Sequence, residues 1–300
     1  MMETKISGLT LRNPLMLASG ILGVSYSTML RVAKHGAAAI VTKSISRRPC
    51  KGYDNPVVVV TEDAVINAVG LSNPGVKAFK TEIEKFREHD KETPLIVSIY
   101  GSRTSDIEAV MNNLPLDMVN GIELNLSCPH AKEAGIVVGK KPGLVKRLLS
   151  ELSKYDVWLS VKISPLLPMD RLLAVFERFE VDAIVASNTL PAMHIDYNTL
   201  KPVLSNVIGG LSGSPLRYVA LAIIYNLFES TEIPLIGCGG VLDYRHVLQY
   251  LACGARAVQI GSGIMVKGLK IFEEILSGLR TFMENRGLTK LSDIVGVAHG

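Results

Sequence analysis

The chain has 300 residues, 48% of them hydrophobic, which is enough for a large core in one domain spanning residues 1–300. Its 32 Lys and Arg residues and 28 Asp and Glu residues are intermixed, and this argues against a nucleic-acid-binding surface while allowing a small anionic ligand. No signal-like N-terminus and no run of about 18 apolar residues is present, so we expect a soluble, cytoplasmic protein without a membrane span.

Eight apolar runs follow one another along the chain, and each ends in polar, charged or glycine residues. They span residues 13–20, 38–44, 95–101, 121–130, 157–164, 183–189, 233–240 and 257–263. Nearly continuous apolar runs of this length are typical of strands buried on both faces, which indicates a parallel sheet.

Helical patterns lie between these runs. Two apolar stripes at helical spacing are Leu148, Leu149 and Leu152, and Leu172, Val175, Phe176 and Phe179. Pro142 suits a first helical turn, and Gly254 suits the end of a helix over 244–253. Eight strands, each followed by a helix, predict a (β/α)8 TIM barrel. The alternative is a doubly wound open sheet, which would gather its ligand at one switch point rather than at eight strand ends.

The run 121–130, GIELNLSCPH, contains the densest group of hydrogen-bonding and nucleophilic side chains. Alternating apolar residues from Ile122 to Leu126 predict a strand, and Pro129 ends it because proline has no N–H for the ladder. Cys128 therefore lies where a strand opens into a loop. Taken alone, a free cysteine is also commonly a small buried hydrophobic residue, and that interpretation remains open at this point.

Glycines end the seventh and eighth runs, as Gly239-Gly240 and Gly261-Ser262. Barrels of this class commonly hold a phosphate between the loops after strands 7 and 8, where glycines let backbone N–H groups approach its oxygens. A tight turn would explain one such pair, but the matched pairs at both strands favour a phosphate site. The glycine-rich segment 209–213, in the long loop expected after the sixth strand, is placed to close over the same group.

Lys43 and Lys162 end two other buried runs, where a charge is costly unless it is paired or used. Together with a phosphate site, they indicate a phosphate-bearing cofactor whose ring lies across the barrel mouth. Beside a flavin, such a lysine would stabilise the anionic reduced ring. The alternative is a structural lysine paired with a barrel carboxylate such as Glu123.

The four cysteines, Cys50, Cys128, Cys238 and Cys253, show no C-x-x-C spacing. This pattern argues against an iron–sulfur cluster, a zinc site or a disulfide framework in this chain. If electrons leave for a metal cluster, we expect the cluster to belong to a partner.

These residues resemble those of the class 1 dihydroorotate dehydrogenases, flavoprotein barrels of pyrimidine biosynthesis, from about residue 5 to residue 280. The similar segments are NP at 13–14, ASG at 18–20, TKS at 42–44, NAVGL at 67–71, NPG at 73–75, NLSCP at 125–129, VK at 161–162 and NT at 188–189. ID at 195–196, KPVLSN at 201–206 and GGLSG at 209–213 are similar to the NAD-linked subgroup, class 1B.

The resemblance implies an FMN cofactor, a dihydroorotate or orotate site and a catalytic base. The matching FMN positions are Ala18, Ser19, Lys43, Ser44, Asn125, Lys162, Ser187, Gly213, Gly239, Gly240, Gly261 and Ser262. The matching substrate positions are Lys43, Asn67, Val69, Gly70, Leu71, Asn125, Asn188 and Thr189. Cys128 matches the base that takes the C5 proton of dihydroorotate while a hydride moves from C6 to flavin N5. The membrane-bound class 2 enzymes have serine as the base and an N-terminal extension, and we expect neither here.

The residue types suit this chemistry independently. Asparagine offers both a donor and an acceptor, so Asn67, Asn125 and Asn188 fit the imide edge of a planar orotate, and Lys43 fits its carboxylate. Asn73 and Asn112 are interpreted as turn residues. A flavin-free phosphate-sugar isomerase or synthase on the same barrel would explain the glycines but not Lys43, Cys128 and Lys162 together.

One position departs from the family pattern. His130 stands where the family usually has asparagine, and SCPH also occurs in dihydropyrimidine dehydrogenases, which reduce uracil or thymine. A protein of that type is therefore the alternative, although KPVLSN and GGLSG favour dihydroorotate. His130 either hydrogen-bonds the substrate or orients its loop. The other histidines, His35, His89, His194, His246 and His299, are interpreted as surface or loop residues.

The resemblance also implies partners but leaves the electron acceptor open. Class 1B relatives are heterotetramers in which a second subunit carries FAD and a [2Fe–2S] cluster and passes electrons to NAD. Class 1A relatives are homodimers that use fumarate. We expect a homodimer of this chain, with the heterotetramer as the other possibility.

Overall fold

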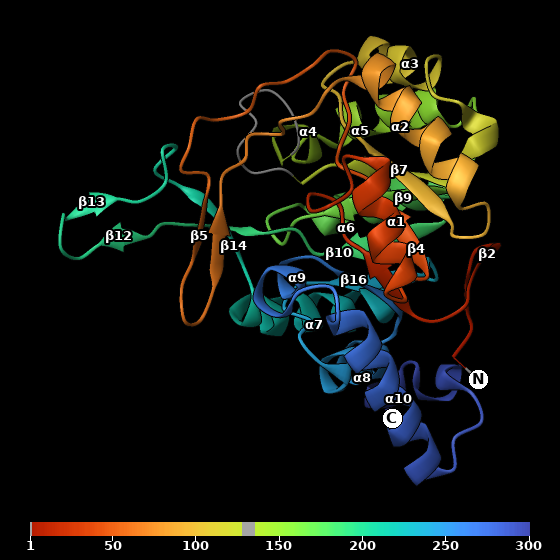
Figure 1. Cartoon of the computed structure of the whole chain (residues 1–300). Coiled ribbons are helices and arrows are strands. Elements are labelled where there is room, and N and C mark those ends of the chain that lie inside the picture. Colours follow the sequence, from red (N-terminus) through yellow and green to blue (C-terminus); the bar gives the residue numbers. More distant parts are fainter. Residues whose placement is uncertain (1, 128–135) are drawn as a thin grey trace.

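The computed structural model describes residues 2–127 and 136–300 (Figure 1). Eight parallel strands close into a barrel in the order β10-β15-β16-β3-β4-β7-β8-β9. In chain order they are β3 (Leu15–Leu17), β4 (Ala39–Val41), β7 (Leu95–Ile99), β8 (Gly121–Asn125), β9 (Leu159–Ile163), β10 (Ala183–Ala186), β15 (Leu235–Cys238) and β16 (Ala255–Ile260). Each corresponds to one of the eight predicted runs, and only β16 begins before its run, by two residues. The (β/α)8 barrel is confirmed, and the open-sheet alternative is wrong.

Helices follow the barrel strands. They are α1 (Tyr26–Lys34), α2 (Val76–His89), α3 (Thr104–Met111), α4 (Ile136–Gly139), α5 (Pro142–Leu152), α6 (Met169–Arg178), α7 (Ser214–Phe228), α8 (Tyr244–Ala252), α9 (Ser262–Lys267) and α10 (Ile271–Arg286), with short 3-10 helices at Leu116–Met118, Leu291–Ile294 and Val297–His299. Pro142 begins α5, and Gly254 follows α8 with φ +110°, as predicted. Among the described helices, none has the length and apolar character needed to cross a membrane.

The barrel has an apolar base and a polar upper interior. Met16, Val41, Ile96 and Val185 are fully buried or nearly so, in a cluster shared with the N-terminal hairpin of β1 (Thr4–Ile6) and β2 (Leu9–Leu11). The indole N–H of Trp158 donates to the Ile6 carbonyl at 3.0 Å, which ties that hairpin to the start of β9. The polar buried residues of the barrel strands are Ser98, Glu123, Asn125, Ser160, Lys162 and Gln259. Buried polar groups need hydrogen-bond partners, so these side chains indicate a functional site at this end of the barrel.

A second, four-stranded antiparallel sheet stands beside the barrel mouth, in the order β11-β14-β6-β5. Its strands are β5 (Val58–Val60), β6 (Val65–Asn67), β11 (Leu190–Ala192) and β14 (Gly209–Ser212), and the hairpin of β12 (Ile195–Asp196) and β13 (Lys201–Pro202) extends outward next to it (Figure 1). The expectation that 209–213 forms a loop is therefore wrong for 209–212. A Cβ atom at Gly210 would overlap the Thr189 side chain, so this glycine permits two chain segments to approach closely.

Candidate active site

A cavity of about 290 Å³ opens at the carboxyl ends of the barrel strands. It is lined by most of the predicted site residues, namely Ala18, Ser19, Lys43, Ser44, Asn67, Val69, Gly70, Leu71, Asn125, Lys162, Ser187, Asn188, Thr189, Gly239, Gly240, Gly261 and Ser262. Gly213 is not part of the lining, and Cys128 and His130 lie outside the described residues. Because functional groups of a TIM barrel gather at this face, the cavity is the candidate active site.

A chain of hydrogen bonds joins the strand ends along one wall of the cavity. Ser44 Oγ lies 3.2 Å from Ser19 Oγ, and Asn125 Nδ2 donates to Ser44 Oγ at 3.0 Å. Asn125 Oδ1 accepts from the backbone N–H and the hydroxyl of Ser127, both at 3.1 Å. Asn188 Nδ2 then donates to Ser127 Oγ at 2.8 Å. These bonds fix the two asparagine side chains relative to each other, and they fix Ser127, the residue immediately before Cys128.

Asn73 fixes the loop that carries the predicted substrate residues 67–71. Its Oδ1 accepts from the Gly75 N–H at 2.9 Å, which is the turn role expected from the sequence. Its Nδ2 also donates to the Leu71 carbonyl at 2.8 Å and to the Tyr100 hydroxyl at 3.1 Å. Burial raises the pKa of Tyr100 to about 12, so this hydroxyl stays protonated. Asn73 therefore connects the substrate loop to the end of β7.

The floor of the cavity holds a buried cation. Lys162 Nζ donates to Gln259 Oε1 at 2.8 Å, and Gln259 Nε2 donates to Glu123 Oε2 at 2.7 Å. Burial opposes the charged ammonium, but Cys238 and Glu123 outweigh it and raise the pKa of Lys162 above its ordinary value. Burial raises the pKa of the Cys238 thiol, and the neighbouring Lys162 opposes that shift. The alternative of direct pairing between Lys162 and Glu123 is replaced by an indirect link through Gln259.

The glycine pairs after β15 and β16 meet at one end of the cavity. Gly239 and Gly240 have φ of +135° and +63°, and a Cβ at Gly240 would lie 2.6 Å from the Gly213 carbonyl oxygen. The Gly213 N–H donates to Ser262 Oγ at 3.1 Å, where the short helix α9 begins. Gly213 thus supports a residue of the lining instead of forming the lining itself. The described backbone here forms a narrow cradle that a side chain would fill.

Comparisons with known proteins agree with this arrangement. Residues 1–283 match the family model described as "Dihydroorotate dehydrogenase". The chain belongs to the dihydroorotate dehydrogenase family. It is therefore an enzyme of this type.

Similar curated proteins carry the name "Dihydroorotate dehydrogenase B (NAD(+)), catalytic subunit". The one from Methanothermobacter thermautotrophicus is 40% identical over 303 aligned positions, covering 100% of this chain and 99% of that protein. The one from Pyrococcus furiosus is 39% identical and covers 99% and 98%. The one from Archaeoglobus fulgidus is 40% identical and covers 99% of each.

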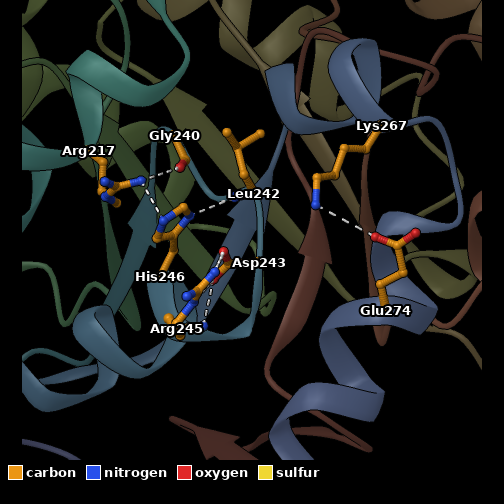
Figure 2. Close-up of polar contacts among 8 residues, drawn as sticks. All are labelled: Arg217, Gly240, Leu242, Asp243, Arg245, His246, Lys267 and Glu274. Atoms are coloured by element: carbon orange, nitrogen blue, oxygen red, sulfur yellow. Dashed lines mark hydrogen bonds and ion pairs between the residues drawn. The ribbon is translucent and has the colours of Figure 1, made fainter.

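This family member also contains a cation behind the glycines of the cavity that sequence reasoning missed (Figure 2). Arg217 of α7 is buried, and its Nη1 lies 3.5 Å from the Gly240 carbonyl and 2.7 Å from Nε2 of His246. The Leu242 N–H donates to Nδ1 of the same ring at 3.0 Å. The interpretation of His246 as a surface or loop residue is wrong, because its half-buried ring lies in α8 between the Leu242 N–H and the Arg217 guanidinium. His299 also differs from that expectation, since its side chain is only 12% exposed and stacks on Tyr225 with ring centroids 3.9 Å apart.

We expect His246 to make stability fall in acid. Burial and the neighbouring Arg217 lower the pKa of His246 below its ordinary 6.5. The unfolded chain therefore takes up a proton at higher pH than the folded protein, and the free energy of unfolding decreases as pH falls below about 6.5. Urea unfolding of wild type and His246→Gln between about pH 7.5 and pH 5 measures this, because glutamine keeps an acceptor but does not titrate. The urea concentration at the unfolding midpoint should fall more with decreasing pH in the wild type than in the variant. An equal fall in both proteins would contradict the assignment.

Proposed function

We propose that this protein oxidises dihydroorotate to orotate in pyrimidine biosynthesis, with FMN bound across the barrel mouth. The observation that carries the proposal is the cavity at the strand ends, which combines a glycine cradle, a buried cation and a wall of fixed asparagines. The proteins named as catalytic subunits of dihydroorotate dehydrogenase B support the same substrate.

The residues fit FMN in two respects. The narrow space around Gly240 suits a group that approaches the backbone closely, as a phosphate does, and the glycines leave N–H groups accessible to it. Lys162 at the cavity floor is suited to a ring that becomes anionic on reduction. We assign the phosphate to Gly239, Gly240, Gly261 and Ser262. When bound, FMN supplies the hydride acceptor that side chains lack.

The remaining roles belong to residues of this chain. Lys43 would bind the carboxylate of the substrate, and Asn67, Asn125 and Asn188 would hydrogen-bond its imide edge. We assign the C5 proton to Cys128. This cysteine follows Ser127, which is fully buried and bonded to two of those asparagines. A base must be held within hydrogen-bond reach of its proton, and the anchored strand end is suited to that task.

We infer that electrons leave through a partner subunit that carries FAD and a [2Fe–2S] cluster and reduces NAD. The support is the name of the similar proteins, which specifies both NAD(+) and a catalytic subunit. Purification of the protein from its native source tests this inference, since a co-purifying flavoprotein is expected.

One experiment tests the substrate and the cofactor together. We expect the purified, reconstituted protein to be yellow, to release FMN on denaturation, and to be bleached anaerobically by dihydroorotate. Dihydrouracil serves as the control because it has no carboxylate for Lys43. Release of FAD, failure to bind FMN, or faster bleaching by dihydrouracil would each refute the proposal.

A further inference from the structure

A line of three buried side chains crosses the barrel interior below the cavity. Gln259 lies on β16 and Glu123 on β8, and in the closed strand order these strands are four positions apart in either direction. They therefore lie on opposite sides of the barrel. Gln259 spans this interior and contacts Glu123 with its amide nitrogen and Lys162 with its amide oxygen.

The register places this line directly under the site wall. Asn125, which lines the cavity, is paired with Lys162 between β8 and β9. Glu123 is paired with Ser160, two residues earlier on each strand. Side chains two residues apart on a strand share a face, so Glu123 lies below Asn125 in the same interior. The carboxylate thus lies deeper in the barrel than Asn125 and Lys162, which line the cavity.

Stability alone gives a poor account of Glu123. Its exposure is 0%, its Oε2 accepts from Gln259, and its Oε1 has no hydrogen-bond partner among the described residues. Burial of a carboxylate carries a desolvation cost that one hydrogen bond does not offset, and an apolar residue of similar size would avoid that cost. The charge is explained if it acts on Lys162, the buried cation at the other end of Gln259.

We infer that Glu123, acting through Gln259, is a positioning residue that keeps the Lys162 ammonium charged and fixed at the cavity floor, and so favours reduction of the flavin. This inference rests on the proposed FMN site. The neutral amide matters because a direct carboxylate contact would cancel the cation at the cavity and draw Nζ away from it. With Gln259 between them, the carboxylate still stabilises the charge of the ammonium, but from a greater distance. The positive charge therefore stays at the cavity.

Other charged or titratable groups near Lys162 do not replace Glu123. Cys238 on β15 stands beside Gln259 in the register and contributes a buried thiol, and Lys43 at the end of β4 adds a second positive charge to the cavity. Tyr250 of α8 donates its hydroxyl hydrogen to the Gly239 carbonyl at 2.7 Å and is not directed at Lys162. Among the described groups, Glu123 is the carboxylate that favours the charged form of Lys162, and the sulfur of Cys238 acts in the same direction.

The test measures the reduction potential of bound FMN against reference dyes from about pH 6 to pH 9. Glu123→Gln keeps the shape but removes the charge, so Lys162 should lose its proton at lower pH than in wild type. The FMN–dye equilibrium of this variant should then shift toward oxidised FMN by roughly tenfold or more near pH 9, equal to about 30 mV for a two-electron couple. Gln259→Met, which removes both hydrogen bonds, should shift the equilibrium in the same direction.

Two further variants serve as controls. Ser160→Ala, one step below Lys162 on the same strand and uncharged, should keep the wild-type potential. Glu123→Gln added to Lys162→Met should change the potential far less than Glu123→Gln alone, since its effect passes through the lysine. Wild-type potentials in both Glu123→Gln and Gln259→Met, or a lower melting temperature without a change in potential, would overturn the inference. A wild-type protein that binds no FMN would instead refute the proposed function.

Discussion

Cys128→Ala should bind FMN and orotate as the wild type does, yet lose nearly all flavin reduction by dihydroorotate. A general base contributes about 10²–10⁴-fold to such a proton transfer, and alanine offers no group to accept the C5 proton. The FMN and carboxylate contacts assigned here are made by other residues of the cavity, so binding should remain. Rapid mixing of the oxidised protein with dihydroorotate, followed at the flavin absorbance, measures the reduction rate directly.

The serine variant provides the matched control. Cys128→Ser should retain a little activity that increases with pH, because a hydroxyl is a weaker acid and a poorer base near neutral pH than a thiol with an ordinary pKa of about 8.5. Orotate titration of each variant checks that the site is intact. Reduction at the wild-type rate in the alanine variant would show that another residue takes the proton.

Lys43→Ala should weaken orotate binding and slow flavin reduction together. Lys43 lines the cavity. In the proposed site it would lie between the substrate carboxylate and the flavin, and each charge-assisted hydrogen bond that it made would be worth about 1.5–3 kcal/mol. We therefore expect orotate affinity to fall by roughly 10- to 100-fold. Titration of orotate against the flavin absorbance measures this loss.

Lys162→Ala is the comparison variant for this prediction. Its ammonium lies at the cavity floor with Gln259, so its loss should slow reduction while sparing orotate affinity. Equal orotate affinity in Lys43→Ala and wild type would show that Lys43 does not bind the carboxylate. Equal losses of affinity in both lysine variants would show that the two cations do not have separate roles.

The barrel could be predicted because its strands are recognisable one at a time. A run such as 95–101 is apolar, short and ended by a polar group, and each of these properties comes from burial on both faces of a parallel sheet. Closure followed from the number of such runs. The residues at their ends could be placed together without distances, because parallel strands bring their carboxyl ends to one face.

The contacts between strands were not predictable in the same way. Gln259 in the run 257–263 and Lys162 in the run 157–164 both stand out as polar residues in a buried strand. Nothing in the sequence shows that Gln259 would span the barrel to Lys162 and Glu123. His246 lies in the amphipathic helix α8, and its role depends on Arg217, which comes from another helix. The strands of the second sheet were missed because they are short, and because β14 contains glycine and β11 contains proline.

The second sheet also has a consequence for how the protein folds. β6 pairs with β14, and the Ser212 hydroxyl donates to the Val65 carbonyl across 147 positions of sequence. Contacts so far apart in the chain form slowly unless the intervening segment is already compact, and here that segment contains four barrel strands, β7 to β10. The wall that carries Asn67 should therefore assemble after that part of the barrel. Substitutions in the second sheet would then accelerate unfolding more than they retard folding, so this side of the cavity is the last to acquire its native structure and the first to lose it.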